Sequence, residues 1–115
     1  MRSKMVVLGV LLEALGIFGL ILPSPLFGLF EVNAGVCLAH IASGSLAIVS
    51  AFRGVGAMRL CGKILGFGYL ALAIIGFAAP DYDIFEYVAF QTPANTLHLV
   101  VAAVFLYVAF LAPPN

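Results

Sequence analysis

Residues 8–23 read LGVLLEALGIFGLILP, and residues 65–80, which start 57 positions further along the chain, read LGFGYLALAIIGFAAP. Both stretches are apolar and end at a proline, which cannot continue a helix because it lacks a backbone N–H and clashes with the preceding turn. With the residues before them, they approach the roughly 20 apolar residues that a helix needs to cross the hydrocarbon of a bilayer. The two stretches therefore predict membrane-spanning helices in two related copies.

The composition of the whole chain agrees with this interpretation. Of the 115 residues, 64% are hydrophobic and only 9% are charged, whereas a soluble domain has about 25% charged residues. Such a chain has too few polar side chains to cover a soluble domain, and its apolar content excludes intrinsic disorder. Two cysteines exclude a disulfide scaffold. A formal net charge of zero without a basic patch excludes nucleic-acid binding.

Four apolar stretches are long enough for transmembrane helices, namely residues 5–22, 32–52, 60–79 and 94–111. Their orientation follows from the charges, because all five basic residues fall on one side of these spans. The basic residues are Arg2, Lys4, Arg53, Arg59 and Lys63. The acidic residues Glu31, Asp81, Asp83 and Glu86 fall on the other side. The positive-inside rule then places both termini in the cytoplasm.

An internal repeat relates the two halves of the chain. At an offset of 57, Leu8, Gly9, Ala14, Gly19 and Pro23 match Leu65, Gly66, Ala71, Gly76 and Pro80, and at an offset of 58 His40 matches His98. Chance similarity between apolar segments is the alternative explanation. We predict an all-α membrane protein in which residues 1–115 form one domain of four transmembrane helices. The domain is a tandem repeat of two helical hairpins, about residues 5–52 and 60–111, inserted in the same orientation.

Glycines are placed where helices of these hairpins would meet. Gly9 and Gly16 lie near one face of the first span, and Gly62 and Gly66 open the third. Small residues let helix backbones approach closely in lipid, where no hydrophobic effect drives association. We expect these glycines to be packing positions, although glycine is also simply tolerated in membrane helices.

Polar side chains within the spans recur at helical spacing, which predicts a network that faces the interior of the bundle. Its members are Glu13, Asn33, Cys37, His40, Ser43, Gln91, Asn95 and His98. An unpaired polar group in hydrocarbon is costly, so these side chains should pair with one another. Ordinary structural histidines, hydrogen-bonded to a neighbour such as Asn95, are one interpretation of His40 and His98.

Two functional interpretations of this network stay open. His40 and His98 occupy equivalent positions on two helices and would suit the axial ligands of a haem or a chlorophyll-type pigment. Alternatively, Glu13 and His40 lie at similar depth in a hairpin and would suit a small proton- or solute-conducting unit. No carboxylate or thiol cluster completes a metal site, so we expect no metal and otherwise no cofactor.

Enzyme motifs are absent, including a Gly-rich phosphate loop, a Ser-His-Asp set and paired carboxylates. We therefore expect no enzymatic activity. The favoured hypothesis is a small polytopic membrane protein that acts through helix packing as an accessory or structural subunit or an assembly partner. Its expected partners are the lipid bilayer and another membrane protein or a second copy of the chain.

Three segments carry a resemblance to a known family: residues 26–48 (LFGLFEVNAGVCLAHIASGSLAI), 67–77 (FGYLALAIIGF) and 92–106 (TPANTLHLVVAAVFL). Nearly the whole chain resembles a bacterial family of small four-helix integral membrane proteins that is catalogued as a domain of unknown function. The family pattern has asparagine where this chain has Cys37 and Gln91, and a small residue at Val101. The resemblance implies the fold and a location in the bacterial inner membrane, and it supplies no activity.

Overall fold

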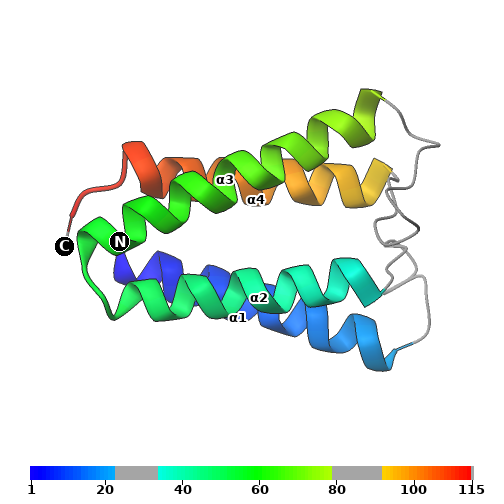
Figure 1. The fold of residues 1–115 in the computed structure, drawn as a ribbon, viewed down its shortest axis with the longest axis horizontal. Helices are drawn as coiled ribbons and strands as arrows, with labels where there is room; N and C mark the ends of the chain where they lie inside the picture. Colours follow the sequence, from blue (N-terminus) through cyan, green and yellow to red (C-terminus); the bar gives the residue numbers. More distant parts are fainter. Residues whose placement is uncertain (23–33, 79–91, 115) are drawn as a thin grey trace.

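The computed structural model describes residues 1–22, 34–78 and 92–114. These residues form four α-helices, which are α1 (Arg2–Ile21), α2 (Ala34–Ala51), α3 (Val55–Ala78) and α4 (Thr92–Phe110) (Figure 1). The predicted all-helical fold with four helices is confirmed.

The ends of the helices follow from local chemistry. Helix α1 ends at Ile21, and Leu22 has an extended backbone because Pro23 disfavours the helical conformation of the residue before it. Helix α3 begins at Val55, five residues before the predicted span. The reason is Gly54, whose φ of 109° makes a tight turn directly after α2. The helix therefore continues through the basic segment that the sequence had suggested was a loop.

The helices pair into two hairpins, α1 with α2 and α3 with α4, and α2 also contacts α3 (Figure 1). Both chain ends lie at the same end of the molecule as the turn between α2 and α3 (Figure 1). We call α1–α2 hairpin 1 and α3–α4 hairpin 2.

Close approach of backbones holds each hairpin together. A Cβ atom on Gly9 would lie 2.6 Å from Ile48 Cγ1, and one on Gly66 would lie 2.7 Å from Leu106 Cδ2. A Cβ atom on Gly62 would lie 2.6 Å from the carbonyl oxygen of Phe105. A Cβ atom on Gly9 would also lie 2.8 Å from the carbonyl oxygen of Gly44. At Gly9 and Gly62 a backbone atom therefore blocks any side chain, which confirms the predicted role of these glycines in packing.

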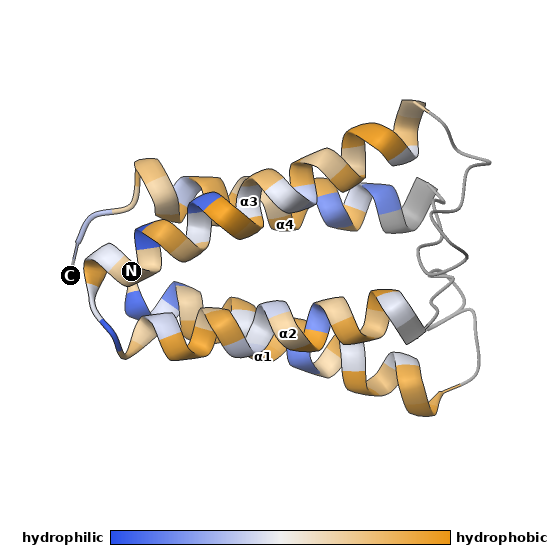
Figure 2. Cartoon of the chain, viewed as in Figure 1, coloured by the Kyte–Doolittle hydropathy of each residue, from blue (hydrophilic) through white to orange (hydrophobic). Residues whose placement is uncertain are grey.

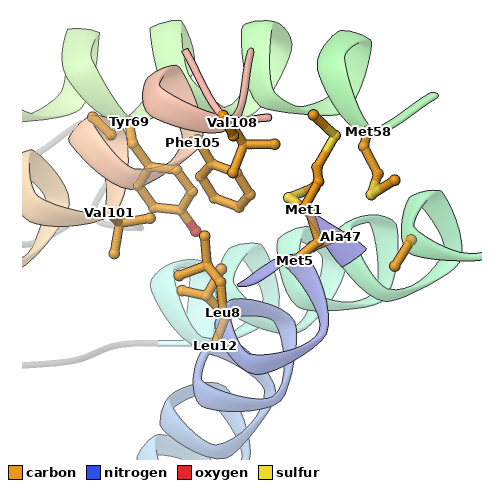
Figure 3. Packing of buried hydrophobic residues seen from close by; sticks show 13 residues of the cluster. Met1, Met5, Leu8, Leu12, Ala47, Met58, Tyr69, Val101, Phe105 and Val108 are labelled. Atoms are coloured by element: carbon orange, nitrogen blue, oxygen red, sulfur yellow. The ribbon is translucent and has the colours of Figure 1, made fainter. Parts of the chain in front are cut away.

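Long side chains fill the space between the two hairpins instead (Figure 3). Hairpin 1 contributes Met5, Leu8 and Leu12, and hairpin 2 contributes Tyr69 and Phe105. Other members of this core are Met1, Ala47, Ala51, Met58, Val101, Ala102, Val108 and Ala112. The two hairpins are therefore separate packing units joined by one side-chain core.

The outside of the bundle is apolar, and orange segments cover most of the four helices in Figure 2. Large exposed hydrophobic residues occur on every helix, for example Ile21, Leu38, Ile64 and Phe110. Among the described residues, α1 and α3 are long and apolar enough to cross a membrane, and α2 and α4 contain shorter apolar segments, Gly35–Ala51 and Asn95–Phe110.

Candidate functional site

Four polar side chains are buried between the hairpins, and a fifth, Asn95, lies one turn before His98 against Gly76 of its own hairpin; we call these five the histidine cluster. They are His40 and Ser43 of α2, Tyr69 of α3, and Asn95 and His98 of α4. The exposed fractions of His40 and His98 are 3% and 1%. Each of the three helices contributes because it turns one face toward the gap between the hairpins, where Phe105 and Leu12 form the apolar continuation.

Aromatic rings form the centre of the cluster. The ring centroids of His40 and His98 lie 5.7 Å apart in an edge-to-face arrangement. The Tyr69 ring stacks on His40 at 6.1 Å, lies 5.6 Å from His98, and stacks on Phe105 at 6.1 Å. Tyr69 thus contacts both imidazoles and joins the polar cluster to the apolar core.

One hydrogen bond of the cluster crosses from hairpin 2 to hairpin 1. Tyr69 Oη donates to Ser43 Oγ at 3.0 Å. Sequence reasoning missed Tyr69, although a tyrosine hydroxyl in the middle of an apolar helix usually has a hydrogen-bond partner when buried and was itself a signal.

Several buried polar atoms of the cluster lack a hydrogen-bond partner among the described residues. They are His40 Nε2, His98 Nδ1, and both Oδ1 and Nδ2 of Asn95. The Asn95 amide occupies the space that the missing side chain of Gly76 leaves, since a Cβ atom on Gly76 would overlap it. A buried polar atom without a hydrogen-bond partner costs about 1–3 kcal/mol. A small polar molecule that hydrogen-bonds to these atoms would therefore stabilise the site.

A cavity of about 20 Å³ lies between the two histidines, lined by Val36, Ala39, His40, Tyr69, Leu72 and His98. A buried water needs about 10–15 Å³ and two or more polar partners. The cavity therefore has room for one water beside both imidazoles. Ligand pockets for larger organic molecules measure about 300–1,000 Å³, so a haem or chlorophyll ring does not fit between His40 and His98 in this packing.

Glu13 lies apart from the histidine cluster, on the outer side of hairpin 1. Its Oε1 accepts a hydrogen bond of 2.6 Å from Ser45 Oγ, and this pair is exposed. Ser45 follows Ser43 by two residues and so points to the opposite side of α2, because each helical residue turns by about 100°. The structure thus gives Glu13 a hydroxyl partner on the outer surface, away from the cluster that contains His40.

The other predicted members of the network have different positions. Cys37 is buried one turn before His40 and carries a free thiol. Asn33 and Gln91 lie outside the described residues. Within the described ranges, no group of three or more His, Cys, Asp or Glu residues comes together to hold a metal ion.

Arginines bind the ends of the helices at the opposite end of the molecule. Arg2 Nε donates to the carbonyl oxygen of Ala51 at 3.0 Å, and its guanidinium lies 5.7 Å from the centre of the Phe52 ring. Arg59 donates to the carbonyl oxygens of Val108 and Ala109 in the last turn of α4, at 3.1 and 3.3 Å, and to that of Ala112 just after the helix, at 3.0 Å. These bonds satisfy C-terminal carbonyls that have no partner within the helix.

Comparisons with known proteins yield one match. The profile of a family described as a domain of unknown function (DUF4383) matches residues 2–111, which is nearly the whole chain. Neither the curated proteins nor the solved structures contain a match to the chain.

Proposed function

The chain belongs to the DUF4383 family, whose description assigns no activity, and we propose that it is a non-catalytic membrane protein that crosses the bilayer four times and serves as an accessory subunit or assembly partner. The apolar exterior supports membrane insertion, because Leu38, Ile64 and Leu111 are 58%, 61% and 74% exposed. A soluble monomer rarely exposes so much contiguous apolar surface.

The distribution of charge supports an orientation with both termini in the cytoplasm, which in a bacterial cell means the inner membrane. Arg2 and Arg59 bind helix ends beside the chain termini and the α2–α3 turn (Figure 1). Basic residues concentrate on the cytoplasmic side of membrane proteins.

Recurring contacts support the tandem repeat. The contact of Gly9 with Ile48 corresponds to that of Gly66 with Leu106, at offsets of 57 and 58. The bond from Arg2 to Ala51 corresponds, at the same offsets, to the bond from Arg59 to Ala109. Chance similarity of two apolar segments does not explain matched packing and matched capping, so duplication of one hairpin is the simpler account.

The exposed pair of Glu13 and Ser45 carries the proposed role as an assembly partner. Glu13 is near the middle of α1, a helix of 20 residues, so it lies deep in the bilayer. An acidic side chain costs about 2.5–3.5 kcal/mol at that depth, and such residues almost always face protein or a water-filled cavity. A helix of another protein or of a second copy would cover the pair and accept its polar contacts.

The surroundings of this pair suit a helix-packing surface. Val10, Ile17 and Leu38 are exposed on the same two helices. We call this surface the outer face of hairpin 1. Hairpin 2 has Leu70 and Ala103 at the positions that correspond to Glu13 and Ser45, so its outer face suits plain lipid contact.

Purification from native membranes in mild detergent, with cross-linking before extraction, tests this role. A partner or a second copy should co-purify, and Ala42→Trp on the outer face of hairpin 1 should abolish that association. Val100→Trp, the corresponding change on hairpin 2, is the matched control and should leave it intact. A solitary monomer, or equal effects of the two variants, would contradict the proposal.

The other two hypotheses receive less support from the geometry. The cavity between His40 and His98 has the volume of about one water, and a haem or pigment would require α2 and α4 to separate. A conducting unit would need Glu13 and His40 to share a path, but the hydrogen bond of Glu13 is to Ser45. An absorption spectrum of protein from the native host and a flux assay on Glu13→Gln in liposomes test these two hypotheses.

A further inference from the structure

Two apolar grooves open between the hairpins on opposite sides of the bundle. Groove 1 runs between α1 and α4, has a volume of about 390 Å³, and is lined by Ser3, Lys4, Val7, Leu8, Leu11 and Val104. Groove 2 runs between α2 and α3 and has a volume of about 260 Å³. Its lining includes Leu46, Arg53, Leu60, Cys61, Ile64 and Leu65.

The two grooves are the same feature built twice. Ser3, Lys4, Val7 and Leu8 of groove 1 correspond to Leu60, Cys61, Ile64 and Leu65 of groove 2 at an offset of 57. Val104 of groove 1 corresponds to Leu46 of groove 2 at an offset of 58. Each groove therefore lies between one helix of hairpin 1 and one helix of hairpin 2.

Each groove contains one basic side chain, Lys4 in groove 1 and Arg53 in groove 2. The cations come from positions that the repeat does not relate, since Lys4 corresponds to Cys61 and Arg53 corresponds to Leu111. Duplication of a hairpin explains two apolar grooves. It does not by itself explain a cation in both, because the two basic residues stand at unrelated positions of the repeat.

The other three basic side chains contact helix carbonyls or an aromatic ring, whereas these two cations do not. Arg2 and Arg59 bind helix carbonyls, and Lys63 Nζ lies 5.5 Å from the centre of the Phe110 ring. The side chains of Lys4 and Arg53 make no hydrogen bond, ion pair or ring contact with the described part of the chain. In that part Glu13 is the one acidic residue, and its hydrogen-bond partner is Ser45.

An apolar groove with a free cation at its polar end has the chemistry of an amphiphile site. We propose that each groove binds one acyl chain of an anionic phospholipid, with the lipid phosphate on Lys4 in groove 1 and on Arg53 in groove 2. This inference rests on the membrane insertion proposed above. Basic pockets between helices on the cytoplasmic side of a membrane attract anionic headgroups, and the apolar wall holds the chain.

Native mass spectrometry of the full chain, with added phosphatidylglycerol or phosphatidylcholine of identical acyl chains, tests the proposal. The wild-type chain should retain two phosphatidylglycerol molecules and fewer phosphatidylcholine molecules. Lys4→Gln and Arg53→Gln should each retain one phosphatidylglycerol, and the double variant none. Lys63→Gln removes the same charge at the same end outside both grooves and should still retain two. Retention of two by the double variant, or equal retention of both lipids, would overturn the proposal.

A second set of variants distinguishes a lipid from a free phosphate. Val7→Trp and Ile64→Trp fill the two grooves at corresponding positions and leave the cations unchanged, so each should lose one lipid while the helical content by circular dichroism stays the same. Glycerol 3-phosphate carries the charge without a chain and should displace neither lipid. Its displacement of the lipids, or full retention by both tryptophan variants, would overturn the acyl-chain site.

An alkaline wash of membranes separates this inference from the function it rests on. A chain released into the soluble fraction would contradict membrane insertion and both proposals. A chain that stays in the membrane but shows no preference for phosphatidylglycerol would contradict the lipid sites and leave the assembly role intact.

Discussion

The contacts within each hairpin differ in kind from the contacts between hairpins. Within hairpins, Gly9 and Gly62 bring backbones so close that no side chain would fit between them. Between hairpins, Met5, Tyr69 and Phe105 keep the backbones apart. His40 and His98, the cavity beside them and the two grooves lie at the looser interface, whereas the Glu13–Ser45 pair joins α1 to α2 within hairpin 1. The glycine contacts thus bring the helices of each hairpin together, and the two histidines lie where side chains of the two hairpins meet.

The largest expected effect comes from truncating the core between the hairpins. Phe105 is fully buried there, and Phe105→Ala should lower the free energy of unfolding by about 3–5 kcal/mol. Phe77→Ala removes the same ring from a position that is 49% exposed and should cost less than about 1 kcal/mol. Denaturant titrations in detergent, followed by circular dichroism, measure both. Similar losses for the two variants would show that side-chain packing does not hold the hairpins together.

A smaller effect is expected from the contacts within a hairpin. A Cβ atom on Gly62 would meet a backbone oxygen of Phe105, so Gly62→Ala should destabilise by about 1–3 kcal/mol, as overpacking does. Gly68 lies in the same helix with no atom within 4 Å of a Cβ atom. Gly68→Ala should therefore be neutral or stabilise by up to about 1 kcal/mol, because alanine lowers the entropy of the unfolded chain. The same titrations measure both changes in the free energy of unfolding. A Gly62→Ala variant as stable as the wild type would contradict the close packing of α3 on α4.

The polar link between hairpins should produce the next effect. Ser43→Ala leaves the Tyr69 hydroxyl buried without its partner, at a cost of about 1–3 kcal/mol. Adding Tyr69→Phe removes the unpaired hydroxyl and should recover most of that loss, because two apolar partners of similar shape are nearly neutral. A double-mutant cycle measures the coupling. Additive losses would mean that the bond contributes nothing across the interface.

The smallest effect is expected at the opposite end, where Arg2 and Arg59 bind helix carbonyls. Arg59 makes three such bonds and Arg2 makes one. Arg59→Gln should therefore destabilise more than Arg2→Gln, with losses of about 1 kcal/mol or less in these partly exposed settings. Thermal melts in detergent rank the two variants, and a larger loss for Arg2→Gln would contradict the assignment of these bonds.

Much of the fold could be predicted because its determinants are local. Apolar length and the prolines define four helices, and the spacing of Gly62 and Gly66 indicates a close-packed face. The early start of α3 could not be predicted, because a basic segment that contains two glycines is typical of a loop, and the sequence does not show that Gly54 alone completes the turn after α2. The bonds of Arg59 to the end of α4 were hidden for the same reason.

The same distinction applies to the candidate site. His40 and His98 have a common register in their helices, which the sequence displays, and the structure places their rings 5.7 Å apart. The role of Tyr69 was not predicted, because its hydrogen-bond partner, Ser43, is on the other hairpin and distant in sequence. The side of α1 on which Glu13 lies was equally difficult to predict, because most residues of α1 are apolar and their spacing does not show which of them face α2.

The exposed Glu13–Ser45 pair occurs on one hairpin and has an apolar counterpart on the other. A subunit with a single interaction surface cannot assemble into a filament or a two-dimensional array. It either binds one molecule of another protein or pairs with one copy of itself about a two-fold axis. In both cases the outer face of hairpin 1 is then buried in the interface. An assembly surface on hairpin 1 alone, as proposed above, would therefore limit the complexes of this protein to small, closed ones.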